Sequence, residues 1–206
     1  MSFVFPEAAS PSDSGAPPAG WNSLALTHDF IARRVRTGDL CIDATAGRGR
    51  DTVLLAKLTG PAGRVIALDI QPEAVEATRA LVRREGVADR VEVRLLDHRE
   101  MGELAEQGTV GCVAFNLGWL PGGDHAVHTR AESTIPALEA ALELLRPGGV
   151  VSLCIYYGKQ NGYEERDRVL EWLETLDDRR YSVIRVSFPN RKNDPPIPVF
   201  IQKNGS

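Results

Sequence analysis

The feature that most constrains the fold is residues 40–52, which read LCIDATAGRGRDT. This stretch begins as a short apolar run ending in Asp43, turns through Gly47 and Gly49, and continues with apolar residues at helical spacing. Glycines at such a turn let the backbone approach a ligand closely, and the N-terminus of the following helix offers free N–H groups and a positive dipole. The stretch therefore predicts a strand–loop–helix corner that binds a nucleotide.

The spacing of the glycines separates two classes of nucleotide. A dinucleotide fingerprint requires Gly-x-Gly-x-x-Gly, and Thr52 stands where its third glycine would be. A looser Gly-x-Gly after a strand that ends in an acid resembles the first motif of class I S-adenosylmethionine-dependent methyltransferases. In that class the loop holds the amino acid end of the cofactor. A tight turn without a ligand is the alternative if no other motif agrees.

Two further apolar runs end in an acid. The first ends in Asp69, about 20 residues after the glycines, where a carboxylate can accept both ribose hydroxyls of a nucleotide. An alternative role for Asp69 is to cap the next helix. The second run ends in Asp97-His98, where methyltransferases of this class place a side chain against the adenine. Three successive strands ending in an acid at one sheet edge indicate a single ligand site.

Strands and helices alternate along the chain as far as a fifth strand, which predicts a doubly wound parallel sheet with helices on both faces. The last two strands, 181–188 and 197–203, are joined by a loop too short for a crossover helix and are therefore expected to be antiparallel. The predicted fold is α/β: a Rossmann-like class I methyltransferase with a seven-stranded, mostly parallel sheet and one antiparallel strand. One such domain is expected over residues 21–206, after a disordered tail over residues 1–20 that is rich in Pro, Ser, Ala and Gly.

The region before the fifth strand has clear helix signals. The pattern predicts a helix over residues 135–145, with Ser133 or Thr134 as its N-cap and Pro136 in its first turn. A Pro-Gly-Gly turn ending at residue 149 then leads to the fifth strand.

The fourth strand, residues 110–117, leads into the string FNLGWLPGGD. Ligands in such sheets bind outside the carboxyl ends of the strands, and amino-methylating enzymes carry an Asn/Asp-Pro-Pro-aromatic motif at this place. Asn116 can accept a hydrogen bond from an amine, and Trp119 can stack on a flat base. The alternatives are that Asn116 caps a turn and that Trp119 packs against the tail.

Several strings together resemble one bacterial family. They are LTH at 26–28, DATAGRGRDT at 43–52, DIQ at 69–71, FNLGWLP at 115–121, GD at 123–124, ST at 133–134 and PP at 195–196. Over about residues 24–203 the chain is similar to the bacterial "putative rRNA methylase" family, whose members are understood as tRNA methyltransferases acting on 5-aminomethyl-2-thiouridine at the wobble position. It departs from the usual pattern at Ala46, Arg48 and Arg50, and it has Trp119 where Tyr is more common.

The resemblance implies that the cofactor is S-adenosyl-L-methionine and that Asn116 is the catalytic residue facing the acceptor. The cofactor-binding residues it implies are Asp43, Thr45, Ala46, Gly47, Gly49, Arg50, Asp51, Thr52, Asp69, Ile70, Gln71, Asp97 and His98. The candidate substrate-binding residues are His28, Leu117, Gly118, Trp119, Arg191 and Lys192. The implied reaction is in-line transfer of the sulfonium methyl to an exocyclic aminomethyl nitrogen, and no histidine is placed well enough by sequence to be named as its base.

The overall charge limits how RNA is held. A formal net charge of −4 gives no general attraction to nucleic acid. An anticodon stem-loop of tRNA would therefore need local basic clusters, and the candidates are Arg33, Arg34 and Arg36, and the loop residues Arg191 and Lys192.

The cysteines and the hydropathy set further bounds. Cys41, Cys112 and Cys154 lie in apolar runs without paired spacing, so they are expected to be buried hydrophobes rather than disulfides or metal ligands, and no metal site is predicted. No apolar run is long enough to span a bilayer, and the N-terminus lacks the blocks of a signal peptide. We expect a cytoplasmic protein with no membrane association. A homodimer formed through an exposed sheet edge is compatible with the sequence but not indicated by it.

Two alternatives to a tRNA methyltransferase stay open. One is a methyltransferase for rRNA or for a small metabolite; the acidic charge and the lack of an appended RNA-binding domain favour a metabolite. The other is a non-catalytic protein that binds the cofactor, against which the glycines, the strand-end acids and Asn116 argue.

Overall fold

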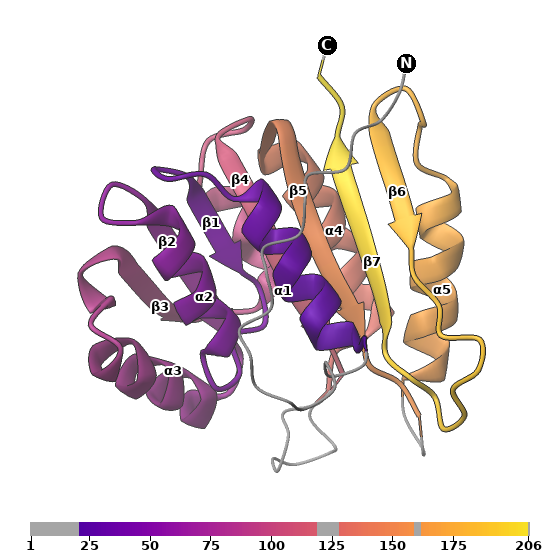
Figure 1. Ribbon diagram of the computed structural model, residues 1–206, viewed down its shortest axis with the longest axis horizontal. Coiled ribbons are helices and arrows are strands. Elements are labelled where there is room, and N and C mark those ends of the chain that lie inside the picture. The colour runs from indigo at the N-terminus through magenta and orange to yellow at the C-terminus, as the bar shows by residue number, and fades with distance from the viewer. Residues whose placement is uncertain (1–20, 119–127, 159–161, 206) are drawn as a thin grey trace, which may run out of the picture.

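The computed structural model describes residues 21–118, 128–158 and 162–205, which form a central sheet with helices on both faces (Figure 1). The predicted tail, residues 1–20, lies outside the described residues. The strands are β1 (Leu40–Asp43), β2 (Arg64–Asp69), β3 (Val91–Leu95), β4 (Val110–Leu117), β5 (Leu145–Ile155), β6 (Tyr181–Arg185) and β7 (Ile197–Lys203). The helices are α1 (Ser23–Arg34), α2 (Arg50–Thr59), α3 (Pro72–Arg84), α4 (Ala131–Leu144) and α5 (Tyr163–Glu174), with short 3₁₀ turns η1 (Ala88–Arg90) and η2 (His98–Glu103).

The seven strands lie in the order β3-β2-β1-β4-β5-β7-β6. The pairs β1–β2, β2–β3, β1–β4 and β4–β5 are parallel, whereas β7 pairs antiparallel with both β5 and β6. The predicted sheet with one antiparallel strand is thus confirmed. The strand order reverses between β1 and β4, and in open α/β sheets this switch point is where ligands bind.

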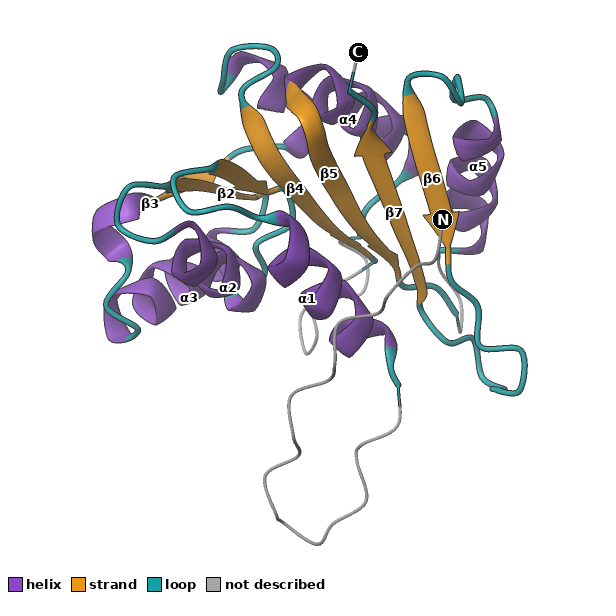
Figure 2. Cartoon of the chain, turned by 45° about the horizontal axis from the view of Figure 1, so that its top comes forward, coloured by secondary structure: helices purple, strands orange, loops and turns teal. Residues whose placement is uncertain are grey.

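Each central strand is apolar on both sides, because helices cover both faces of the sheet. Cys41 and Cys112 contribute to the core under α1, α2 and α3, whereas their neighbours Ile42 and Val113 contribute to the core under α4 and α5. Figure 2 shows the two groups of helices on opposite sides of the sheet. The parallel strands thus lie between two apolar cores, and their carboxyl ends meet at one edge of the sheet.

The three cysteines are buried and free, as the sequence predicts. Burial raises the pKa of the Cys41 thiol to about 12, so this thiol stays protonated at neutral pH. Within the described parts of the chain, no helix combines the length and the apolarity needed to cross a membrane.

The start of α4 differs from the prediction. The helix begins one turn earlier, at Ala131 with Arg130 as its N-cap, so Pro136 lies inside the helix rather than in its first turn. Instead of capping, the Thr134 hydroxyl donates to Glu165 of α5 at 2.6 Å. This tertiary hydrogen bond holds an extra turn that local propensity does not predict.

The start of β5 also differs from the prediction. The Pro-Gly-Gly turn that was expected to precede β5 is part of the strand itself. The strand begins at Leu145, which pairs with Val110, and its register shifts before Val150. The Pro-Gly-Gly segment therefore forms an irregularity within β5, because β4 is available as a pairing partner on both sides of it.

Candidate active site

The glycine loop between β1 and α2 has the conformation that the sequence predicts. Gly47 and Gly49 have positive φ angles of 54° and 78°, a region that favours glycine. A Cβ at Gly49 would lie 3.0 to 3.1 Å from atoms of Thr78 on α3. The Thr78 hydroxyl donates to the Gly47 carbonyl at 3.1 Å. The loop is thus fixed against α3. Gly49 is the N-cap of α2 and provides no side-chain cap, which leaves the first N–H groups of the helix available to a ligand.

Asp43 lies beneath this loop. Its carboxylate is fully buried, accepting from the Thr52 hydroxyl at 2.6 Å and the Thr45 amide at 3.3 Å. Burial, together with the nearby charge of Asp51, raises the pKa of Asp43 to about 7. Asp43 and Thr52 therefore shape the loop from inside the protein, and they are absent from the residues that border the two cavities described below.

Asp69, at the end of β2, links the loop to α3. One carboxylate oxygen accepts from the Gly47 amide at 2.9 Å, and the other accepts from the Gln71 amide at 2.9 Å. The helix cap is Gln71 rather than Asp69, so the capping alternative is wrong. Burial raises the pKa of Asp69. The Gln71 Oε1 atom is buried, and no described residue provides it with a hydrogen bond, so it is available to a ligand.

The end of β3 leads to Asp97 and His98. Asp97 caps η2 by accepting from the Arg99 amide at 3.0 Å, and it also pairs with the Arg99 guanidinium. His98 is buried in a T-shaped contact with the Phe115 ring, and its Nε2 has no hydrogen-bond partner among the described residues. Burial lowers the pKa of His98, so its imidazole is neutral at physiological pH.

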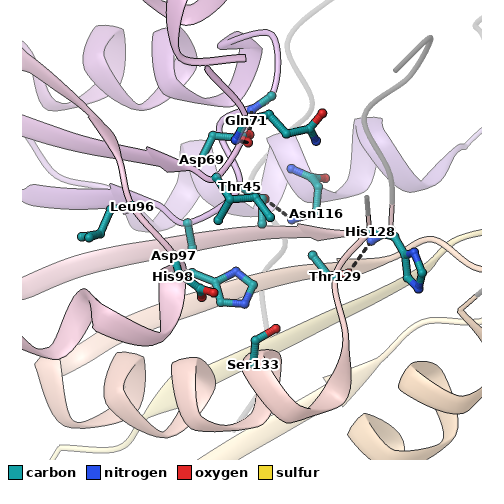
Figure 3. A pocket seen from close by; sticks show the side chains of 14 residues that line it. Thr45, Asp69, Gln71, Leu96, Asp97, His98, Asn116, His128, Thr129 and Ser133 are labelled. Carbon is teal, nitrogen blue, oxygen red and sulfur yellow. Dashed lines mark hydrogen bonds between the residues drawn. The ribbon is translucent and has the colours of Figure 1, made fainter. Parts of the chain in front are cut away.

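These strand ends border one cavity of about 140 Å³. Figure 3 shows the side chains of Asp69, Asp97, His98 and Asn116 around it. The lining residues are Ala44, Thr45, Gly47, Asp69, Ile70, Gln71, Leu96, Asp97, His98, Asn116, Gly118, His128, Thr129 and Ser133.

A second cavity of about 350 Å³ is bordered by the glycine loop and the start of α2. Thr45, Gly47 and Asn116 border both cavities, so the two adjoin at the switch point between β1 and β4, and together they are called the crevice below. The lining residues of the second cavity are Leu24, Thr45, Ala46, Gly47, Arg48, Arg50, Asp51, Asn116, Leu117 and Tyr156. An elongated ligand that follows the crevice from Asp69 across the loop would pass Asn116.

Asn116 is held at this junction by two hydrogen bonds. Its backbone amide donates to the Thr45 hydroxyl at 2.7 Å, and its side-chain Nδ2 donates to Asp51 Oδ2 at 2.7 Å. The other oxygen of Asp51 lies 2.8 Å from Nε2 of His28 on α1. The structure thus joins three residues that the sequence assigns to different roles.

The chain beyond β4 is anchored from α5. Leu117 is buried, and the Gly118 amide donates to the Thr129 hydroxyl at 2.7 Å. Thr129 in turn donates to the buried carboxylate of Glu165 at 2.7 Å. Trp119 lies outside the described residues. Sequence reasoning missed Thr129 and Glu165, since only the tertiary fold brings them to the end of β4.

Two other residues at the site were also missed. Tyr156 immediately follows β5 and borders the second cavity; a strand-end position could have identified it. No sequence pattern identifies Thr78, because its role depends on how α3 packs against the glycine loop.

The two predicted basic clusters lie at opposite edges of the sheet. Arg191 and Lys192 are in the β6–β7 loop, at the edge where β7 starts opposite the end of β5. Arg191 donates to the Trp21 carbonyl and stacks over Phe188 at 4.1 Å, and Lys192 is exposed. By contrast, α1 ends close to the start of β1, and there Arg33 pairs with Asp29.

The described residues contain no group of three or more His, Cys, Asp or Glu side chains that could hold a metal ion.

The sheet order and the acids at successive strand ends are those of the class I S-adenosylmethionine-dependent methyltransferases, and structural neighbours of this class share the fold. A family model described as "Putative rRNA methylase" matches residues 65–202, and the chain belongs to this family. The predicted class and family are thus confirmed.

Known relatives agree with this assignment. The chain is 41% identical over 153 residues to an Arabidopsis thaliana protein named "tRNA (mnm(5)s(2)U34)-methyltransferase, chloroplastic", covering 70% of this chain and 56% of that protein. It spans about half the length of the curated relatives it matches, with 56%, 41% and 46% covered.

Two solved structures match along nearly their whole length. One is a "putative rRNA-methylase" from Clostridium thermocellum, 43% identical with a TM-score of 0.87, covering 90% of this chain and 99% of that one. The other is a "putative methyltransferase" from Streptococcus mutans in complex with SAH, 31% identical with a TM-score of 0.81 and the same coverage.

Proposed function

We propose that this protein is an S-adenosylmethionine-dependent N-methyltransferase of RNA. Its proposed substrate is tRNA carrying 5-aminomethyl-2-thiouridine at the wobble position, and its proposed target is the aminomethyl nitrogen. The observation that carries the proposal is Asn116, whose side chain borders both halves of the crevice at the end of β4. The name of the Arabidopsis relative supports the choice of substrate.

The residues of the first cavity fit the cofactor. Asp69 can also accept ribose hydroxyls, because a carboxylate has about four lone-pair sites and those held by the Gly47 and Gln71 amides leave others for a ligand. The buried Gln71 Oε1 offers an acceptor that no described residue satisfies. Asp97 and His98 border the part of the cavity assigned to adenine, and the glycine loop is assigned to the amino acid end. When bound, S-adenosylmethionine supplies an electrophilic methyl group.

Asn116 acts on the acceptor. An amide oxygen at the junction of the cavities can accept a hydrogen bond from the acceptor amine and thereby align its lone pair with the reaction axis. Catalysis then rests on proximity and orientation.

Neither His28 nor His98 is assigned as a general base on the acceptor. Nε2 of His28 is hydrogen-bonded to Asp51, and His98 borders the cavity assigned to the cofactor. We therefore assign no general base and infer that the amine loses its proton to solvent before it attacks.

The β6–β7 loop is the proposed contact for the anticodon stem-loop. Its cations Arg191 and Lys192 share an edge of the sheet with Asn116. RNA would thus be held by a local cluster on a chain whose net charge is −4. Activity in the cytoplasm as a monomer or a homodimer completes the proposal.

Methyl transfer from labelled S-adenosylmethionine tests this function. The acceptor is tRNA from cells that lack the terminal wobble methylation, and nucleoside mass spectrometry identifies the product. We expect a methylated aminomethyl-thiouridine. No incorporation into this tRNA, with S-adenosylhomocysteine still bound, would refute the proposed substrate.

A second candidate is rRNA, favoured by the family description. Ribosomal RNA from the same cells serves as the parallel acceptor, and incorporation into rRNA alone would establish this candidate. A small-metabolite acceptor is tested by supplying small amines in place of RNA.

A further inference from the structure

The carboxylate of Asp51 connects three elements around the crevice. It lies in the first turn of α2, and its side chain is only 11% exposed. One oxygen is 2.8 Å from His28 Nε2 on α1, and the other accepts from Asn116 Nδ2 at the end of β4 at 2.7 Å. An acid in the first turn of a helix is stabilised by the helix dipole without such partners, so the dipole alone does not explain this bridge.

The chemistry of the bridge fixes the orientation of the Asn116 amide. The pKa of Asp51 is lowered from its usual value. Burial by itself would raise this pKa, but the hydrogen bonds from His28 and Asn116 outweigh burial. An ionised carboxylate only accepts hydrogen bonds. Nδ2 of Asn116 must therefore face Asp51, and the carbonyl oxygen must point to the other side of the planar amide. Figure 3 shows the nitrogen and the oxygen of this side chain pointing in different directions.

The backbone leaves the amide little freedom to move away. The main-chain N–H of Asn116 donates to Thr45 at 2.7 Å, so the residue is held at both its backbone and its side chain. His28 completes the arrangement by binding the second oxygen of Asp51, which ties α1 to the same carboxylate.

We propose that Asp51 is a positioning residue, rather than a ligand of the cofactor, and that it orients Asn116 so that the acceptor site selects a group that donates a hydrogen bond, as an aminomethyl group does. This inference rests on the proposed function and deepens it. An amine donates one N–H to the Asn116 oxygen and keeps its lone pair free to attack, whereas an acceptor without a hydrogen to donate, such as a tertiary amine or a thioether, leaves that oxygen unpaired. The bridge thus specifies the chemical class of the acceptor.

The first test follows the amide itself. The side-chain amide protons of Asn116 are observed by heteronuclear NMR and assigned by their absence in Asn116→Ser. We expect Asp51→Ala to lower their protection from solvent exchange by at least about 10-fold. Asp29→Ala, which removes an exposed, ion-paired carboxylate from α1, is the matched control and should change nothing. Unchanged exchange in Asp51→Ala would overturn the proposal.

The second test separates positioning from cofactor binding. With hypomodified tRNA as acceptor, Asp51→Ala should lower kcat about 100-fold through misplacement of the acceptor. Its affinity for S-adenosylhomocysteine, measured by calorimetry, should stay within about threefold of the wild type. A loss of affinity as large as the loss of turnover would make Asp51 a cofactor ligand and overturn the proposal.

A swap of the two side chains provides a rescue. In Asn116→Asp two carboxylates face each other across a 2.7 Å contact and cannot both ionise. Adding Asp51→Asn restores an amide donor to a carboxylate and again presents an oxygen to the acceptor. We expect the double variant to recover at least about 10-fold in turnover over Asn116→Asp, and no recovery would count against the orientation argument.

Failure of the proposed function gives a different result. If the wild type shows the protected Asn116 amide and loses it in Asp51→Ala, but does not methylate this tRNA, then the substrate is wrong and the positioning of Asn116 stands.

Discussion

The contact between Gly49 and α3 provides a direct test of how the glycine loop is built. Gly49 has a φ of 78°, and a Cβ there would lie 3.0 Å from the Thr78 backbone Cα and 3.1 Å from its side-chain atoms. Thr78 is fully buried, and the nearest of these atoms belongs to the backbone of α3 rather than to the end of a flexible side chain. The left-handed conformation costs an alanine about 1–2 kcal/mol, and crowding adds about 1–3 kcal/mol. Gly49→Ala should therefore lower the free energy of unfolding by about 2–5 kcal/mol.

Gly86→Ala is the matched control. Gly86 also has a positive φ, of 68°, but a Cβ there would meet nothing within 4 Å. It should show only the conformational cost, about 1–2 kcal/mol. Urea unfolding measures both variants, and calorimetry measures their affinity for S-adenosylhomocysteine. Only Gly49→Ala should weaken that affinity, because only Gly49 forms the loop. If the two variants were equally stable and bound S-adenosylhomocysteine equally well, the close packing of the loop against α3 would contribute neither to stability nor to ligand binding, and the prediction would be wrong.

Three further predictions concern charge. Asp69→Ala removes a carboxylate that holds the Gly47 and Gln71 amides; it should weaken S-adenosylhomocysteine binding about 10- to 100-fold by calorimetry, and full affinity would exclude Asp69 from the site. The pKa of Asp43 is raised to about 7 in the folded protein, so its contribution to stability is greatest below the unfolded pKa of about 3.9 and is lost as pH rises through about 7. The free energy of unfolding, measured by urea unfolding at each pH, should thus fall less between those pH values in Asp43→Asn than in the wild type, and an equal fall in the two proteins would disprove this. Reversing the charges of Arg191 and Lys192 should weaken tRNA binding and reduce the salt slope by about 1–2, whereas reversing Arg33 and Arg34 at the other edge should not; equal effects would remove the β6–β7 loop from the interface.

The strand-end acids were predictable because they depend on local patterns. Each lies at the end of an apolar run, and parallel strands bring their carboxyl ends to one edge. The sequence therefore placed Asp69, Asp97 and Asn116 together without knowledge of side-chain contacts. The same topology could have separated Arg33 and Arg34 from the site, since a helix that precedes the first strand ends at the opposite edge.

Direction and partnership of side chains were not predictable. Asp43 and Asp51 lie eight positions apart in one loop motif, yet Asp43 is buried beneath it and Asp51 faces the crevice. The Glu165 network bridges residues that are 31 and 36 positions apart, and it also adds the first turn of α4. Such contacts depend on tertiary packing, which overrides local propensity.

The most direct test of the proposed role of Asn116 is the turnover of Asn116→Ala with tRNA that lacks the terminal wobble methylation, measured beside the affinity of the variant for S-adenosylhomocysteine. Asn116 borders both halves of the crevice and is the residue assigned to the acceptor. We expect kcat to fall about 100-fold while the affinity for the cofactor product changes little. Full turnover with intact cofactor binding would contradict the assignment of the acceptor site to the end of β4.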